Sequence, residues 1–430
     1  MPVDDAVRTD LRALLGAVEA ASPVNVVAVL ANELRRMVGA VDVSFLIADF
    51  SGDALIRFPS DLSSYDGDPA PAAKPGTEPL DDLATVYLIG SVYEKAMWSQ
   101  QVVVEPADDL IRVYAPVTDR GDAIGVLELV LPATPDEEVL SFVASAAHAL
   151  AYVIIANRWH TDLFERGQRN VPFNLAAEIQ RRLLPAAFTC EAAEFTVACW
   201  LEPAHEIGGD TFDYSVEQEA LHLTISDAKG HEVHAAQLAT LAVSSLRNSR
   251  RARDGVAAQA QAANAAIRAY GADEDFVTAL IVRIDLVTGL VGLVNAGHPA
   301  AHLVRDGIVK TLVFEADLPL GMSEDGVYRE QTLTLRPGDR LVLVTDGMLE
   351  RNATSLDIAA ALAIMTELHP REVVHSFARA VLNASGGRLE DDATLLCVDW
   401  YGRRRGDGDD RVSAAGASTI RASDVADAVP

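Results

Sequence analysis

The chain has 430 residues, half of them hydrophobic, so it can bury two ordinary cores, and two domains are the natural expectation. Its 63 acidic residues against 35 basic ones give a net charge of −28. This balance disfavours nucleic acid and anionic membrane surfaces as partners, because both attract basic proteins. The three cysteines are too few and too scattered for a disulfide scaffold, and no C-x-x-C pair indicates zinc.

The N-terminus carries no basic segment followed by an apolar core, so the sequence shows no signal peptide. The longest apolar run, residues 142–156, is shorter than the roughly 20 residues that a membrane span needs. We therefore expect a cytoplasmic protein that does not enter a membrane.

The first 160 residues combine two helices, several strands and a closing helix. Apolar spacing predicts the first helix, and Ser22-Pro23 can cap and begin the second. Proline, glycine, aspartate and serine crowd one stretch, which predicts a long surface loop. In chain order the expected elements are helices over 11–18 and 22–37, a strand over 41–49, the loop over 51–79, strands over 101–104 and 111–117, a hairpin turn over 119–122 followed by the strand AIGVLELVL, and a helix over 136–160.

That order, with YAPV and GDAIGVLELV before the closing helix, resembles a GAF domain over about residues 5–158. The resemblance implies an α/β sensor domain that binds a small ligand or mediates dimerisation. No cysteine precedes Cys190, so thioether attachment of a bilin is excluded. An α+β domain that only dimerises is an equal alternative. We assign residues 1–158 to this GAF-like domain.

Residues 159–188 are expected to form a helical connector. Asn174 can cap a short helix that Pro185 soon ends. Leu175, Ile179 and Leu183 form one apolar stripe on it. The stripe either packs on its own domain or acts as a lever between the two domains.

Strands dominate from Glu194 onward, with two helical blocks between them. The expected strands are FTVACWLEP, ALHLTISD, VTALIVRIDLVTG, LVGLVNAGH, AHLVRDGIV, RLVLVTDG and ATLLCVDW, and the expected helical stretches are 233–248 with 255–270, and 356–384. Mostly antiparallel strands with two helical blocks predict a layered α+β sandwich over 189–401. The tail 402–430 lacks apolar periodicity and is expected to be disordered.

Aspartates stand at the ends of several of these strands, and the positions are Asp210, Asp227, Asp346, Asp391 and Asp392. Clustered carboxylates raise each other's pKa unless a cation compensates them. Hard oxygen ligands favour magnesium or manganese over zinc. Each motif alone is compatible with an ordinary turn, and only the combination is specific.

The combination resembles the SpoIIE-like, PPM-type serine/threonine phosphatases over about residues 174–401. The motifs that carry the resemblance are EIGGDTFDY, SDAKGHE, NAGHP, LPLGM, LRPGDRLVLVTDGMLE and DDATLL, preceded by AAEIQRRLLP. It implies a PPM-type αββα sandwich after the GAF-like domain. RsbU-like regulators, with a sensor domain before the phosphatase, have the most similar architecture.

The resemblance also implies ligand roles for two divalent cations, manganese or magnesium. Asp210 would bridge them, and Asp227 with the carbonyl of Ala228 would hold one. Asp346 and Asp391 would hold the other, with Asp392 beside them in a less certain role.

Two histidines lie in glycine-flanked loops beside these aspartates. His231 could orient a water or donate a proton to the leaving oxygen. A loop histidine that is hydrogen-bonded to backbone is at least as good an interpretation for His231 and for His298.

One position departs from the family's usual D-x-x-G-H-G, because Glu232 replaces the last glycine. A glutamate would be strained if the position needs a positive φ. We expect instead that Glu232 begins the next helix, where its charge favours the helix dipole.

The only dense basic patch of the catalytic half comprises Arg247, Arg250, Arg251 and Arg253. It is interpreted either as a solvated helix end or as a docking surface for an acidic phosphoprotein.

We therefore expect a serine/threonine phosphatase regulated by its N-terminal domain. The family resemblance suggests a phosphorylated anti-sigma factor antagonist as substrate, and the apolar stripes suggest a homodimer. The alternatives are a catalytically silent binding module with this fold, or a hydrolase of small phosphoesters.

Overall fold

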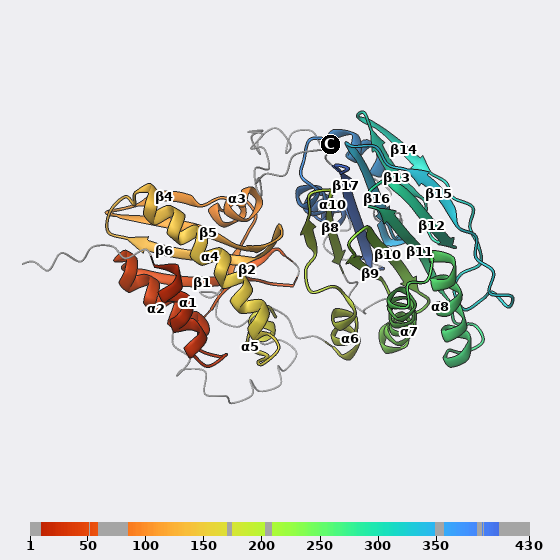
Figure 1. Cartoon of the computed structure of the whole chain (residues 1–430), viewed down its shortest axis with the longest axis horizontal. Helices are drawn as coiled ribbons and strands as arrows, with labels where there is room; N and C mark the ends of the chain where they lie inside the picture. Colours follow the sequence, from red (N-terminus) through yellow and green to blue (C-terminus); the bar gives the residue numbers. More distant parts are fainter. Residues whose placement is uncertain are drawn as a thin grey trace, which may run out of the picture.

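The computed structural model describes residues 10–50, 52–58, 85–169, 174–202, 209–348, 357–384, 389 and 391–403. The described elements form three sheets whose strand pairs are antiparallel (Figure 1). One sheet belongs to the described residues between 10 and 169, which we call the N-terminal unit. The other two belong to those between 189 and 403, the C-terminal unit.

The sheet of the N-terminal unit has the strand order β3-β2-β1-β6-β5-β4. Its strands are β1 (Asp42–Ala48), β2 (Ala54–Arg57), β3 (Thr85–Tyr87), β4 (Val103–Ala107), β5 (Leu110–Asp119) and β6 (Asp122–Leu131). The helices are α1 (Leu11–Ala20), α2 (Val26–Val38), α3 (Val92–Ser99), α4 (Glu137–Asn157) and α5 (Leu163–Gly167). Helices α1, α2 and α4 share one core with the sheet, and α3 packs in a second core on the same sheet.

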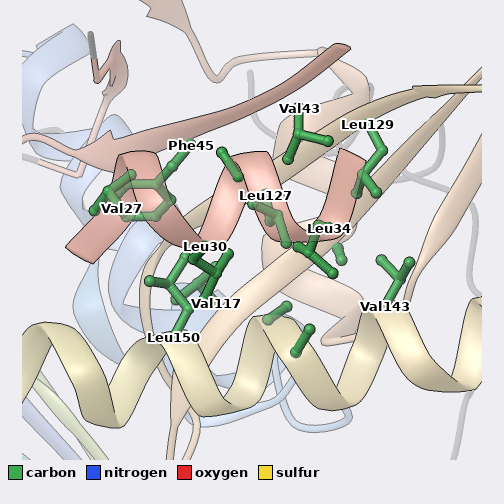
Figure 2. Close-up of a cluster of buried hydrophobic side chains, with 14 of the residues drawn as sticks. Val27, Leu30, Leu34, Val43, Phe45, Val117, Leu127, Leu129, Val143 and Leu150 are labelled. Carbon is green, nitrogen blue, oxygen red and sulfur yellow. The ribbon is translucent and has the colours of Figure 1, made fainter. Parts of the chain in front are cut away.

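The larger of these cores lies between the sheet and helices α2 and α4 (Figure 2). Leu30 and Leu34 of α2 are fully buried, as is Leu150 of α4. Helix α4 passes for a membrane span by length and composition. Its residues Val143 and Leu150 point into this core instead, which explains its apolar composition.

The predicted strands and closing helix of this unit are confirmed, but three details differ. The second helix begins at Val26 after a turn, not at Ser22-Pro23. Part of the expected long loop is β2, which the polar composition around it concealed, and residues 59–84 lie outside the described part. Strand β3 and helix α3 were missed. The strand has only three residues, and the eight residues of α3 carry little apolar periodicity, although Ser91 caps it.

The C-terminal unit is a sandwich of two sheets, ordered β15-β12-β11-β10-β9 and β14-β13-β16-β17-β8-β7. The strands are β7 (Thr189–Glu191), β8 (Phe195–Glu202), β9 (Thr211–Val216), β10 (Ala220–Ala228), β11 (Val277–Asp285), β12 (Leu290–Ala296), β13 (Ala301–Arg305), β14 (Ile308–Leu312), β15 (Gln331–Thr334), β16 (Asp339–Val344) and β17 (Ala393–Trp400). A buried apolar cluster that includes Phe195, Leu223 and Leu343 fills the space between the sheets.

Helices cover the outer faces of both sheets, so the layers follow the order αββα (Figure 1). Helices α7 (Glu232–Arg251) and α8 (Val256–Tyr270) pack on one sheet. Helices α9 (Ile358–Ile364) and α10 (Pro370–Ala384) pack on the other. The connector helix α6 (Leu175–Leu183) lies against α7. The predicted mixed α+β class and layered sandwich are confirmed.

Sequence patterning missed the short strands β7, β9 and β15. The run AHLVRDGIV is not one strand but the hairpin β13–β14, because Asp306 and Gly307 both adopt positive φ in a tight turn. The expected helical block 356–384 is divided into α9 and α10, with Pro370 beginning the second helix. The tail beyond residue 403 lies outside the described part. The GAF likeness and the domain boundaries remain predictions.

A buried ion pair on the sheet that contains β16 and β17 also binds the segment between α9 and α10. Arg340 of β16 is bidentate to Asp399 of β17, with nitrogen–oxygen distances of 2.6 and 2.9 Å. The same guanidinium donates to the carbonyls of Met365 and Leu368, between the two helices. Because Arg340 is 5% exposed, these four contacts are shielded from water.

Replacing this arginine, as Arg340→Met, should destabilise the C-terminal unit by about 3 kcal/mol, because it leaves a carboxylate and two carbonyls without their donor. Urea unfolding followed by circular dichroism measures the loss. Arg268→Met, on the exposed side of α8, is the matched control and should leave the transition unchanged. Equal midpoints for both variants would contradict this account.

Candidate metal centre

The first aspartate of the centre is positioned by a glycine that cannot be replaced. A Cβ on Gly209 would lie 2.3 Å from the carbonyl oxygen of Ala228, so only glycine allows the two segments to touch. The amide of Ala228 donates to the carbonyl of Gly209 at 3.2 Å. This contact places Asp210, at the start of β9, beside Asp227 at the end of β10.

The carboxylate of Asp210 is buried and held by two hydroxyl groups of the opposite sheet. Thr345 and Thr394 each donate to its Oδ2 at 2.7 Å, and Asp210 is 2% exposed. Burial nevertheless raises the pKa of Asp210 well above its ordinary value, and the neighbouring carboxylates of Asp392 and Asp227 raise it further. The site thus concentrates negative charge that a cation would compensate.

A residue that sequence reasoning did not single out completes this cluster. The side-chain amide of Gln180, on α6, donates to Asp392 Oδ2 at 3.0 Å and to the carbonyl of Asp210 at 2.8 Å. Gln180 is 4% exposed. A buried polar residue within AAEIQRRLLP is the signal that could have identified it, because a buried amide needs partners.

The second pair of aspartates meets through another close glycine contact. A Cβ on Gly347 would lie 1.9 Å from the carbonyl oxygen of Asp392, which forces the turn after β16 against the start of β17. Burial raises the pKa of Asp391, and the nearby Asp346 carboxylate adds to the effect. Asp391 is half-buried and Asp346 is exposed.

Within the described ranges, no three His, Cys, Asp or Glu side chains converge closely enough to enclose an ion by themselves. The carboxylate and carbonyl oxygens are hard donors, which fit magnesium or manganese better than zinc. Magnesium retains several waters and takes one or two carboxylates, whereas zinc sites close around four protein or water ligands. The carboxylate groups, together with the Ala228 carbonyl that the Gly209 contact brings close, therefore fit such a cation.

The two histidines behave differently. His231 is exposed at the N-cap position of α7. His298 is buried, with its Nδ1 2.9 Å from Thr278 Oγ1 and its amide donating to Asn295 Oδ1 at 2.7 Å. Burial lowers the pKa of His298 to about 3, so this imidazole is neutral at physiological pH. His298 therefore fits the structural interpretation, whereas His231 lies exposed at the surface.

Glu232 combines the two situations that the sequence analysis treated as alternatives. It is the first residue of α7, as expected. It also has φ of 58°, a conformation that glycine adopts without strain. The expectation that a helix start would remove the need for positive φ is therefore wrong, because the turn after Gly230 enters the helix from the left-handed region.

The basic patch is not a continuous surface. Arg247 and Arg250 both bind the buried carboxylate of Asp213, at 2.8 and 2.9 Å. Arg247 also donates to the carbonyl of Leu183 at the end of α6. Both interpretations of the patch, as a solvated helix end and as a docking surface, are wrong for these two residues. The remaining two arginines of the patch are exposed.

The predicted cap of the connector helix is confirmed, because the Asn174 side chain accepts a hydrogen bond from the amide of Ala177. The predicted stripe differs, because Leu175 is 64% exposed while Gln180 points inward. Ile179 and Leu183 do pack on α7 and its neighbours. The buried face of α6 is thus centred on the polar residue that reaches the aspartates.

Glu232→Gly should raise the stability of the C-terminal unit by about 1 kcal/mol, because an L-residue in the left-handed region carries a strain that glycine lacks. Chemical denaturation measures the change. Glu232→Ala keeps a Cβ at positive φ and serves as the control, with no such gain expected. A glycine variant that is no more stable than the alanine variant would refute the strain.

Thr394→Val should weaken manganese binding about tenfold, because Asp210 loses one of the two donors that orient it. Isothermal titration calorimetry gives the affinity. Thr196→Val, an equally buried position in the neighbouring strand β8, makes the same chemical change away from Asp210 and should bind as wild type does. Unchanged affinity in Thr394→Val would show that the hydroxyl does not support the centre.

Comparison with known proteins identifies relatives of this part of the chain. Residues 217–401 match the family model for stage II sporulation protein E (SpoIIE). The chain is 25% identical over 236 residues to the phosphoserine phosphatase RsbP of Bacillus subtilis (strain 168), which covers 52% of this chain and 57% of that relative. The match thus spans less than two thirds of the relative's length.

Solved structures also resemble this chain. The RsbU and RsbW domains of a Mycobacterium tuberculosis protein share 23% identity over 49% of this chain and 61% of that chain, with a TM-score of 0.45. The catalytic domain of the serine/threonine protein phosphatase PstP, solved with two manganese ions, shares 18% identity over 48% of this chain and 98% of its own, with a TM-score of 0.38.

Proposed function

We propose, from the match of residues 217–401 to the SpoIIE family model, that the protein is a metal-dependent serine/threonine protein phosphatase. The observation that carries the proposal is the buried Asp210 carboxylate, which Thr345 and Thr394 hold beside further aspartates. A structural role alone would not bring carboxylates together at such a cost in desolvation.

In this proposal, Asp210 would help to hold two divalent cations, manganese or magnesium. Asp227 and the Ala228 carbonyl would serve one cation, and Asp346 and Asp391 would serve the other. When bound, the cations supply a nucleophile at neutral pH and neutralise charge on the phosphate. Both threonine hydroxyls bind Oδ2 of Asp210, which leaves Oδ1 for a cation.

Of the remaining residues, one positions the aspartates and another would transfer a proton. Gln180 fixes Asp392 and the backbone of Asp210, so the ligand loops enter the reaction already ordered. His231, exposed at the start of α7, would donate a proton to the departing seryl or threonyl oxygen. The exposed position of Asp346 leaves the centre open to a phosphoprotein side chain.

The substrate that we propose is a small cytoplasmic phosphoprotein of the anti-sigma factor antagonist type, with the N-terminal unit as sensor. Support comes from the relative RsbP, a phosphoserine phosphatase, and from the acidic net charge of −28, which disfavours nucleic acid. A small ligand of the N-terminal unit would carry the signal.

We further propose a homodimer through the outer face of α4. This helix carries no Asp, Glu, Lys or Arg between Glu138 and Arg158; Tyr152 on it is 50% exposed, and Trp159, just past its end, is 86% exposed. A second copy would cover these aromatic rings. Light scattering at micromolar concentration should give twice the chain mass, and a monomeric mass would reject the dimer.

The first test is phosphate release from a generic phosphoester with added manganese, for wild type and Asp210→Asn together. Wild type should turn over only with the metal, and the variant should lose at least about a hundredfold because the shared ligand loses its charge. Arg268→Met, in the exposed part of α8, should retain full activity. Activity that survives in Asp210→Asn would refute the proposed centre.

Comparing a phosphoserine peptide with nucleotides as substrates then separates a protein phosphatase from a hydrolase of small phosphoesters. The specific observation that favours a silent binding module is the strained Glu232 beside His231. If wild type binds manganese but releases no phosphate while Glu232→Gly does, strain at this residue suppresses turnover.

A further inference from the structure

We propose that the N-terminal unit docks on the C-terminal unit through two contacts and thereby restrains α6, the helix whose Gln180 holds the aspartates of the metal centre. This inference rests on the proposed function only for its effect on metal affinity. The docking and the restraint of α6 stand on contacts within the chain itself.

The first contact is made by the β5–β6 hairpin turn, which meets the edge strand β7. Asp122 Oδ1 accepts hydrogen bonds from the amides of Phe188 and Thr189, at 3.0 and 3.1 Å. The carbonyl of Arg120 accepts from the amide of Glu191 at 2.8 Å. A turn of the N-terminal unit therefore supplies the hydrogen-bond partners that an edge strand lacks.

Glycine at the tip of this turn makes the approach possible. Gly121 has φ of 83°, and a Cβ there would lie 2.4 Å from Glu191 Oε1. Its carbonyl accepts from Arg371 of α10 at 3.0 Å. Arg371 also pairs with Glu191 at 3.1 Å, so the turn is held by the sheet and by a helix of the C-terminal unit.

The second contact joins α3 to α10, which lie side by side in Figure 1. Trp98 stacks on His375 with ring centroids 6.1 Å apart, and Arg379 lies over the same indole at 4.9 Å. Arg379 also reaches Glu94 at 3.4 Å. Burial lowers the pKa of His375 to about 4, so its ring is neutral in this stack at physiological pH.

Arg181 connects the docked face to the metal centre, because it is the residue next to Gln180 on α6. Its guanidinium lies over the ring of Phe50 of the N-terminal unit at 4.6 Å and over Phe188 at 5.4 Å. Adjacent residues of one short helix thus contact the N-terminal unit and the aspartates. A displacement of Phe50 would therefore either shift Gln180 or distort α6.

Among the described residues, several arginines at or near this interface have buried nitrogen atoms without hydrogen-bond partners, so the docked state is less strongly favoured over the separated one. The Nε atoms of Arg158, Arg181 and Arg371 are buried without a hydrogen-bond partner in the part of the chain that the structure describes. Burial, together with the like charge of Arg158, lowers the pKa of Arg181 to about 10. Water would satisfy these donors on separation, so release of the N-terminal unit carries a compensating gain.

The test uses two variants of the full chain, one at each contact. Asp122→Lys removes the carboxylate that accepts from the amides of Phe188 and Thr189. It also places a third positive side chain near Arg158 and Arg181. Arg379→Glu places like charge against Glu94. Their matched controls are Asp306→Lys, at the exposed tip of the β13–β14 turn, and Arg268→Glu, on exposed α8. The double variant with Glu94→Arg and Arg379→Glu restores opposite charges at the second contact.

Three measurements are compared for each protein: small-angle X-ray scattering, hydrogen exchange of residues 175–183, and manganese affinity by calorimetry. Both variants should increase the radius of gyration and speed exchange in α6 about tenfold. Manganese affinity should fall by about the same factor. The controls should match wild type, and the charge-swapped double variant should recover compactness.

Separation of the units without faster exchange in α6 would overturn the restraint. An unchanged radius of gyration in both variants would overturn the docking. Faster exchange of α6 in both variants, in a protein whose wild type binds no manganese, would support the docking and the restraint but refute the proposed phosphatase.

Discussion

The arrangement of the C-terminal unit depends on one buried interaction, the pair of threonine hydroxyls that donate to the carboxylate of Asp210. Asp210 directly precedes β9 of one sheet, whereas Thr345 directly follows β16 and Thr394 lies in β17, both strands of the other sheet. These bonds cross the sandwich at the point where the strand ends meet. They fix the register of the layers and, in the same contact, the orientation of the central carboxylate.

Close glycine contacts place the other acidic groups around that carboxylate. Gly209 against Ala228 and Gly347 against Asp392 leave no room for a side chain, so the loops approach to backbone distance. Burial, and after it the neighbouring carboxylates, raise the pKa of Asp210 and Asp391. Tight backbone contacts and unfavourable electrostatics therefore coincide at this end of the sandwich.

Sequence reasoning predicted the mixed α+β class, the long strands and the positions of the aspartates, because these depend on periodicity and on local motifs. It missed α3 and β9, which are too short to show a period, and it gave Leu175 to the buried face of α6. Gln180 and Arg250 could not be assigned from spacing alone. Their burial depends on partners 30 and 37 residues away, Asp210 and Asp213, which only the fold brings into contact.

The short helix between the two units has a consequence for how such proteins can be recombined. Arg181 contacts Phe50, and Gln180 contacts Asp392, so the connector is shaped by both of its neighbours at once. A different N-terminal unit joined at residue 174 would supply neither Phe50 nor the turn that bears Asp122. Replacing the N-terminal unit therefore requires the β5–β6 hairpin and the first two turns of α6 to be kept together.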